Sequence, residues 1–189
     1  MSVPATALVV VDVQRAHVEH DPPPHDVDGL LAAVRTLLAA ARAAGALVVH
    51  VQDVGDADPR FPLDHGEDDG DQGGRALVLD VRAGEPVVRK RLDDPFVDTD
   101  LAGILAGHAV VVVAGLQSEM CVAATARGVV ACGAAVVLPH DAHSTWDVPA
   151  GPAGAAIPAD HVRRVAAWSL GDDAHLPLTS VEVTFAAMP

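Results

Sequence analysis

One stretch decides how this chain folds: Val110-Val111-Val112-Val113-Ala114-Gly115-Leu116-Gln117-Ser118-Glu119-Met120-Cys121-Val122. Its apolar, β-branched first part, Val110 to Ala114, predicts a buried strand of a parallel sheet. Ser118 then offers a hydroxyl N-cap, and the residues from Glu119 to Ala131 are typical of a helix. The sequence therefore predicts a strand that turns directly into a helix, which is the repeating unit of an α/β fold.

Cys121 falls in the first turn of this expected helix. Free N–H groups and the positive end of the helix dipole favour an anion there, so we expect the position to lower the pKa of the thiol. A thiolate is the reactive form of cysteine, which makes Cys121 a candidate nucleophile. The alternative is that Cys121 is a small buried residue, as free cysteines usually are.

Strands and helices alternate along the rest of the chain. We expect strands at Ala7–Val13, Ala46–Gln52, Pro86–Leu92, Ala109–Ala114, Ala134–Pro139 and Thr179–Phe185. We expect helices at Val27–Ala44, Asp98–Ala106, Glu119–Ala131 and Ala159–Leu170. This pattern predicts a single α/β domain over residues 1–189, with three αβα layers. Its centre is a Rossmann-like, six-stranded, mostly parallel sheet that carries helices on both faces.

Composition limits the partners and the compartment. The 26 acidic residues outnumber the 12 basic ones, for a formal net charge of −14, which argues against nucleic acid and anionic membranes as partners. The two cysteines, Cys121 and Cys132, stand about 16 Å apart if one helix holds both, too far for a disulfide. The apolar run Ala7–Val11 is too short for a signal peptide, and no stretch is long enough to span a bilayer. We therefore expect a cytoplasmic protein.

Two further residues could meet the thiol at the sheet edge. Asp12 ends the first strand, and ligands of doubly wound sheets bind beyond the carboxyl ends of the strands. Poor hydration there should raise the pKa of Asp12, although a carboxylate that only caps a loop is the alternative. Strand alternation points Lys90 inward and its neighbours Arg89 and Arg91 outward. The alternative for this segment is a basic edge strand whose charges block aggregation.

These elements together resemble the isochorismatase-like cysteine hydrolases, the superfamily of nicotinamidases and N-carbamoylsarcosine amidohydrolase. The resemblance covers nearly the whole chain. It rests on Leu8-Val9-Val10-Val11-Asp12-Val13-Gln14, on Arg89-Lys90 followed by Phe96, on Gly115 to Val122 with Ala124-Thr125-Ala126, and on Asp141-Ala142. The order and spacing of these motifs together are specific for that superfamily.

The resemblance implies a catalytic triad of Asp12, Lys90 and Cys121. It implies a cis peptide bond between Leu116 and Gln117, and backbone N–H groups of Gln117 and Cys121 that form an oxyanion hole. Side chains that could line the substrate pocket are Gln14, His17, Phe96, Leu116 and Trp146. His17 replaces a residue that is often Phe in this family, and by default we expect it in a surface loop. Trp146 could either cover the substrate or anchor its loop. The resemblance also implies a homodimer or homotetramer.

The sequence departs from the metal-binding branch of that superfamily. Nicotinamidases carry an Asp-x-His pair after the second strand, where this chain has Gln52-Asp53-Val54-Gly55-Asp56. His65 in the acidic segment Asp64–Asp71 could bind a metal adventitiously, and His140, Asp141 and His143 form a second group of metal-ligand types. The resemblance makes Asp141 a structural residue instead. We expect no cofactor and no physiological metal, so nicotinamide is a poor substrate candidate.

Three functions follow in order of preference. The first is a metal-independent cysteine hydrolase that cleaves a C–N bond of a small amide, lactam or ureido substrate through an acyl-enzyme. The second is an isochorismatase-type vinyl-ether hydrolase, whose reaction needs no thiol nucleophile. The third is a thiol redox or binding protein that uses the same fold without turnover. A dinucleotide-binding domain is disfavoured, because Asp12-Val13-Gln14-Arg15-Ala16 has no Gly-x-Gly turn after the first strand.

Overall fold

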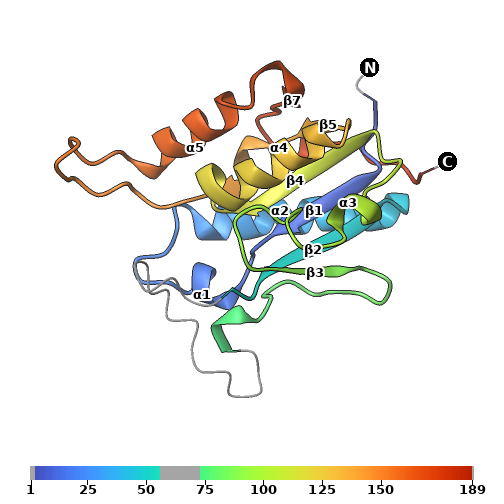
Figure 1. Cartoon of the computed structure of the whole chain (residues 1–189), viewed down its shortest axis with the longest axis horizontal. Coiled ribbons are helices and arrows are strands. Elements are labelled where there is room, and N and C mark those ends of the chain that lie inside the picture. Colours follow the sequence, from blue (N-terminus) through green and yellow to red (C-terminus); the bar gives the residue numbers. More distant parts are fainter. Residues whose placement is uncertain (1–2, 56–72, 189) are drawn as a thin grey trace.

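A parallel sheet forms the centre of the molecule (Figure 1). The computed structural model describes residues 3–55 and 73–188. In this part of the chain the strands are β1 (Ala7–Val11), β2 (Leu47–Asp53), β3 (Val87–Lys90), β4 (Val110–Leu116), β5 (Ala135–Val137), β6 (His143–Ser144) and β7 (Ala174–His175). Their order is β3-β2-β1-β4-β5-β7, and β6 pairs with β4 near its carboxyl end. All of these pairings are parallel.

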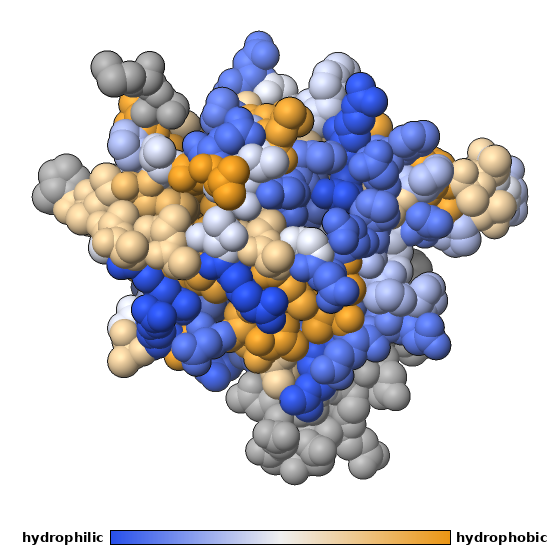
Figure 2. Space-filling model, turned by 180° about the vertical axis from the view of Figure 1, so that it is seen from behind, coloured by the Kyte–Doolittle hydropathy of each residue, from blue (hydrophilic) through white to orange (hydrophobic). Residues whose placement is uncertain are grey.

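Helices cover both faces of the sheet. They are α1 (Arg15–Val18), α2 (Val27–Ala44), α3 (Leu101–Ile104), α4 (Ala123–Ala131) and α5 (Ala159–Trp168). Short helical turns lie at Gly73–Arg75, His140–Ala142, Gly171–Asp173 and Ser180–Glu182, and a wider turn at Ser118–Val122. Helix α2 lies behind the sheet in Figure 1, whereas α3, α4 and α5 lie on the other side. Hydrophilic side chains (blue) cover much of the rear face, where they border an apolar area (Figure 2).

The two faces of β1 explain the three layers. Every residue of β1 is buried, and alternate side chains point to opposite faces of a strand. Val9 packs into the cluster that contains α4 residues, whereas Leu8 and Val10 pack into the cluster of α2. A strand that is apolar on both sides is stable only between two helical layers. The sequence prediction of an αβα architecture is confirmed.

Helix α2 has the bounds that the sequence predicts. The Asp26 side chain accepts a hydrogen bond from the backbone N–H of Gly29 at 3.3 Å and caps the helix start. Gly45, with φ of 70°, ends the helix in the left-handed conformation that glycine adopts without strain.

The sheet has seven strands where the sequence predicts six. The expected strand Thr179–Phe185 is wrong, because Thr179 and Glu182 form a capping box around the helical turn at 180–182. Strands β6 and β7 were not predicted, since two residues are too few for a periodic pattern. Helix α1 was missed for a similar reason, because it has only four residues.

The carboxyl ends of β1 and β4 approach each other closely, at the point where the strand order reverses. Strand β1 is followed in sequence by β2 on one side, while β4 lies on its other side. Gly115 of β4 pairs with Val11 of β1 and has a φ of 128°. A Cβ atom at Gly115 would lie 2.0 Å from the carbonyl oxygen of Val11, so only glycine fits. A reversal of strand order is where doubly wound folds bind their ligands.

Among the described residues, none of the helices combines the length and the apolar character that a membrane crossing requires. The acidic segment around His65, with the rest of residues 56–72 in the long connection before β3, lies outside the described residues.

Candidate active site

The ends of four neighbouring strands bring the candidate residues together. Asp12 directly follows β1, Asp53 is the last residue of β2, and Lys90 is the last residue of β3. Asp53 and Lys90 are direct partners in the β2–β3 register. Cys121 follows β4, in the turn that leads into α4. The parallel arrangement therefore places three charged groups and a thiol at one edge of the sheet.

Lys90 is the centre of this group. Its Nζ lies 2.9 Å from Asp12 Oδ2, 3.2 Å from Asp53 Oδ2 and 3.3 Å from Cys121 Sγ. An ammonium has three protons, so one is available for each of these contacts. Lys90 is buried while Arg89 and Arg91 are exposed, which confirms the predicted alternation. The neighbouring carboxylates and the thiol raise the pKa of Lys90 although burial opposes this, so Lys90 stays positively charged.

Asp12 is buried at the end of β1 with a strained backbone. Its φ is 50°, a left-handed conformation that Asp tolerates better than most residues. Its close partner is the Lys90 ammonium, whose Nζ lies 2.9 Å from Oδ2. Burial raises the pKa of Asp12, and the attraction of Lys90 offsets this in part. The direction predicted from the sequence is confirmed.

Cys121 differs electrostatically from the sequence prediction. Its side chain is 8% exposed, and burial, together with the charge of Asp12, raises the pKa of the thiol although Lys90 opposes the shift. The prediction of a lowered thiol pKa is wrong, because burial outweighs the effect of a helix start. In the resting protein the sulfur is therefore a thiol beside a carboxylate that can accept its proton.

The turn before α4 also differs from a regular capped helix. The N–H of Val122 donates to the carbonyl of Gln117 at 3.0 Å, a hydrogen bond that spans five residues, and Met120 has non-helical dihedral angles. Ser118 does not cap the helix as predicted, since its Oγ lies 2.8 Å from Nδ1 of the buried His143. This bond holds the turn against β6.

The peptide bond between Leu116 and Gln117 is cis, as the family resemblance implies. The backbone N–H groups of Gln117 and Cys121 lie on either side of the Ser118–Met120 segment, at the carboxyl end of β4. Their role as oxyanion donors stays a prediction.

Two carboxylates near the site were not singled out from the sequence. Asp53 binds the Lys90 ammonium, and its Oδ1 accepts the N–H of Gly55 at 2.8 Å. Asp93 is exposed, yet its Oδ1 lies 3.7 Å from Cys121 Sγ. The position of Asp53 at the end of a strand beside Lys90 is a signal that could have found it. Asp93 lies in a turn after β3, whose path the sequence does not specify.

Two of the pocket candidates are buried and engaged elsewhere. The Gln14 amide donates to the carbonyls of Asp53 and Arg75 at 3.0 and 2.9 Å, and it accepts the N–H of Asp53 at 2.8 Å. Gln14 therefore fixes the end of β2 instead of facing a ligand. Leu116 is fully buried in the cluster on the α2 side of the sheet and is not available to line a pocket.

The aromatic candidates have structural contacts. His17 is buried, against the expectation of a surface loop, because its Nδ1 lies 2.9 Å from the carbonyl oxygen of Asp12. Trp146 donates its Nε1–H to the carbonyl of Pro22 at 2.8 Å and packs edge-on to His17, which favours the loop-anchoring role. The ring of Phe96 lies against Gly128 of α4, where a Cβ atom would be 2.2 Å from it. A substrate contact by these side chains stays a prediction.

Residues 3–55 and 73–188 hold no group of three or more His, Cys, Asp or Glu side chains arranged to bind a metal. The Asp141 carboxylate accepts hydrogen bonds from the backbone and hydroxyl of Ser180 at 2.7 to 3.0 Å, so its role is structural. His143 bonds Ser118, whereas His140 lies 3.7 Å from Asp160. The His65 segment lies outside the described residues.

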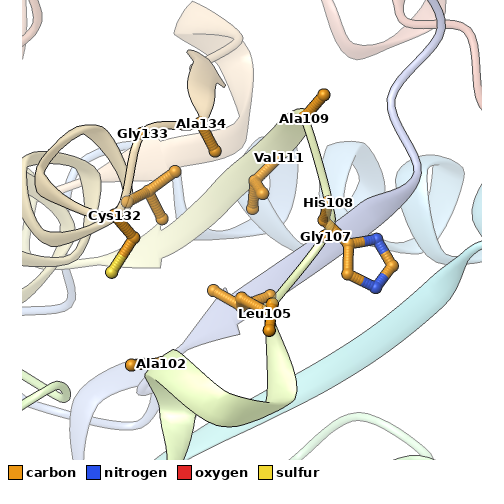
Figure 3. A pocket seen from close by; sticks show the side chains of 11 residues that line it. Ala102, Leu105, Gly107, His108, Ala109, Val111, Cys132, Gly133 and Ala134 are labelled. Carbon is orange, nitrogen blue, oxygen red and sulfur yellow. The ribbon is translucent and has the colours of Figure 1, made fainter.

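A cavity of about 530 Å³ lies at the amino end of β4, the end away from Cys121 (Figure 3). Its lining is mostly apolar and includes Ala102, Leu105 and Val111, with Cys132 beside them. Cys132 is exposed and, like Cys121, is a free thiol. This cavity adjoins the amino end of β4 and is therefore separate from the group around Lys90.

Comparison with known proteins identifies the family of the chain. The family model described as the Isochorismatase domain matches residues 6–156. A streptothricin hydrolase from Streptomyces noursei is 46% identical over 195 residues, which make up 98% of this chain and 73% of that protein.

Solved structures share the fold. An isochorismatase from Pseudomonas putida superposes with a TM-score of 0.79 at 27% identity, over 97% of this chain and 94% of the other. An N-carbamoylsarcosine amidase from Thermoplasma acidophilum has a TM-score of 0.72 at 23% identity, over 94% of this chain and 97% of the other. The second likeness supports the fold alone.

Proposed function

The chain belongs to the isochorismatase family of hydrolases, and on that basis we propose that it is a cysteine amidohydrolase that cleaves a C–N bond of a small amide, lactam or ureido compound. One observation carries this proposal: a buried ammonium contacts both a carboxylate and a thiol, with Lys90 Nζ 2.9 Å from Asp12 and 3.3 Å from Cys121. The similarity to streptothricin hydrolase makes streptothricin the first substrate to test.

The first half-reaction forms an acyl-enzyme. Asp12 accepts the proton of the Cys121 thiol as the sulfur attacks the amide carbonyl carbon. The backbone N–H groups of Gln117 and Cys121 bind the oxyanion that develops. When the C–N bond breaks, protonated Asp12 gives its proton to the departing nitrogen, and a thioester remains on the sulfur.

The second half-reaction releases the acid. Asp12, again a carboxylate, accepts a proton from a water molecule that attacks the thioester carbonyl. The thiolate leaves, Asp12 returns the proton to sulfur, and the site is restored. Lys90 keeps its charge throughout and stabilises whichever partner is anionic, because its pKa lies above its ordinary value.

Charge at the site supports a mechanism without a metal ion. By the family resemblance, Asp53 corresponds to the start of the metal-binding pair of nicotinamidases, and Gly55 stands where their histidine would be. The Asp53 carboxylate is instead engaged by the Lys90 ammonium at 3.2 Å. A divalent cation at Asp53 would face that positive charge at short range, which is unfavourable.

The test uses the purified protein and two matched cysteine variants. Streptothricin is incubated with wild type, Cys121→Ala and Cys132→Ala, and the products are identified by mass spectrometry. We expect wild type and Cys132→Ala to add one water across a C–N bond, and Cys121→Ala to be inactive although folded. If wild type turns over no member of a panel of amides, lactams and ureido compounds, the proposal fails.

The same variants separate the two alternative functions. Cleavage of isochorismate that survives in Cys121→Ala would indicate the vinyl-ether reaction, which needs no thiol nucleophile. Oxidation or acylation of Cys121 that stops after one equivalent would indicate a redox or carrier protein.

A further inference from the structure

Asp93 is the exposed neighbour of the candidate nucleophile. Its side chain is exposed whereas Cys121 is 8% exposed, and the two meet with Oδ1 3.7 Å from Sγ. A carbonyl carbon must come within about 3.5 Å of the sulfur to react. Any substrate that does so also comes within reach of the Asp93 carboxylate.

This carboxylate has no cationic partner within residues 3–55 and 73–188. Its one described side-chain contact is the Cys121 thiol, a weak hydrogen-bond donor. Arg75, another cation near the end of β2, donates to a backbone carbonyl at 3.5 Å. Asp93 is therefore free to bind a positively charged group that arrives with the substrate.

The charges around the thiol are also unbalanced. The Lys90 ammonium meets two carboxylates, Asp12 and Asp53, so this trio carries one excess negative charge. Asp93 adds a second. By itself Asp93 hinders the nucleophile, since its negative charge raises the pKa of the Cys121 thiol. A cation bound between Asp93 and the sulfur would remove that hindrance at the moment of attack.

We infer that Asp93 is a specificity-determining residue, and that the substrate carries an ammonium or guanidinium group close to the bond that is cleaved. This inference rests on the proposed function, because it takes Cys121 as the reacting atom. A charge-assisted hydrogen bond to a carboxylate is about 2.8 Å long. With the 3.7 Å between Asp93 and the sulfur, an amino group on the α- or β-carbon of the acyl part is within reach.

The first experiment needs no turnover. Cys121 is alkylated with 2-bromoethylammonium (cationic), iodoacetamide (neutral) and iodoacetate (anionic), and the rate at Cys121 is read by peptide mass spectrometry. In each reaction the sulfur displaces a halide ion. The exposed Cys132 of the same molecule reports the intrinsic reactivity of each reagent. The rate at Cys121 is divided by the rate at Cys132 for each reagent. We expect this ratio to be about tenfold or more higher for the cationic reagent than for the anionic one.

Two matched variants assign this preference to one side chain. Asp93→Asn keeps the shape and removes the charge, and should lower the preference by about tenfold. Asp94→Asn removes the same charge one residue away, where Oδ1 accepts the N–H of Phe96 at 2.9 Å, and should leave most of the preference intact. If Asp93→Asn keeps the wild-type preference, or if both variants lose it equally, the inference is overturned.

The second experiment measures turnover with two matched amides. β-Alanine 4-nitroanilide carries a β-ammonium group, and propionic acid 4-nitroanilide lacks it. We expect kcat/KM to favour the first, and Asp93→Asn to lower it about tenfold or more for the first while changing the second much less. Selective alkylation by the cationic reagent, in a protein that turns over no member of the amide, lactam and ureido panel, would support cation binding by Asp93 at Cys121 and count against the proposed function. Turnover that is equal for both anilides in wild type would overturn the inference and leave the proposed function standing.

Discussion

Replacing Lys90 by Met removes the charge on which the site depends. Lys90 and Asp12 are fully buried, and the 2.9 Å between them corresponds to an attraction of about 6 kcal/mol at an effective dielectric constant of about 20. Met has a similar volume, so little packing is lost. What remains is a buried carboxylate without its cation, a loss that typically costs about 3–5 kcal/mol of folding free energy.

Protonation of Asp12 in Lys90→Met reduces the cost of burying this carboxylate without its cation. Lys90 lowers the pKa of Asp12, so its removal raises that pKa further. A protonated Asp12 cannot accept the thiol proton, and the thiol also loses the cation that favours its ionisation. We expect kcat/KM at neutral pH to fall by at least about 10³-fold, within the roughly 10⁴-fold that 6 kcal/mol allows. Activity should recover in part as the pH rises.

The assay is the pH profile of kcat/KM, together with the pH profile of Cys121 alkylation by iodoacetamide. Both should show an acidic limb displaced to higher pH in Lys90→Met. A variant that lost activity by the same factor at every pH, with the limb in its wild-type place, would refute the electrostatic reasoning. Far-ultraviolet circular dichroism of the variant checks that the fold persists.

Three other predictions concern neighbouring features. Asp53→Asn removes a charge that raises the pKa of Asp12, so the acidic limb of the kcat/KM profile should move to lower pH, the opposite direction from Lys90→Met. Burial tends to raise the pKa of Glu85, but hydrogen bonds from Arg42, Arg82 and His50 outweigh it and lower that pKa to about 2. Glu85 therefore stabilises the folded protein above about pH 4.5, and this contribution is lost as the pH falls toward 2. Glu85→Gln should therefore cost about 2–3 kcal/mol in urea unfolding at pH 7 and little near pH 2. Gly115→Ala should cost about 3 kcal/mol or more in thermal unfolding, because the methyl group overlaps the backbone of β1.

Two of these predictions have a control variant within the chain. Glu19→Gln alters an exposed pair in which Arg15 is 3.8 Å away, and it should leave stability almost unchanged. Gly84 also has a positive φ, of 88°, but the space around an added methyl group is open. Gly84→Ala should therefore cost about 1 kcal/mol of folding free energy. If Gly84→Ala and Gly115→Ala lost equal amounts of stability, this would argue against the close approach of Gly115 to the backbone of β1. An acidic limb that Asp53→Asn shifts upward would argue against the stated role of Asp53.

The sequence predicted those parts of the fold that local pattern determines. Helix α2 has its predicted bounds because an 18-residue amphipathic run lies between a capping Asp and a terminating Gly. Lys90 faces inward because strand alternation decides the face once the strand is recognised. The segment after Thr179 could not be judged this way, because a local capping box overrides an alternating pattern.

Three residues of the site were predictable from the sequence, but Asp53, Asp93 and the electrostatics of the site were not. Asp12, Lys90 and Cys121 stand at element ends that the topology brings together. The thiol pKa depends on burial beneath segments distant in sequence and on the sum of several charges, which spacing does not reveal. Asp93 is close to Cys121 only because of the path of the turn after β3, and no periodic pattern encodes that path.

The most direct test of the account is the covalent state of Cys121 during turnover. Reactions with streptothricin, or with another amide that proves to be a substrate, are quenched in acid within the first turnover and digested for mass spectrometry. We expect the substrate acyl group on the peptide that contains Cys121, in wild type and Cys132→Ala alike. The adduct should accumulate under conditions in which deacylation is slower than acylation. Full turnover by Cys121→Ala, or an acyl group found on another residue, would contradict the account.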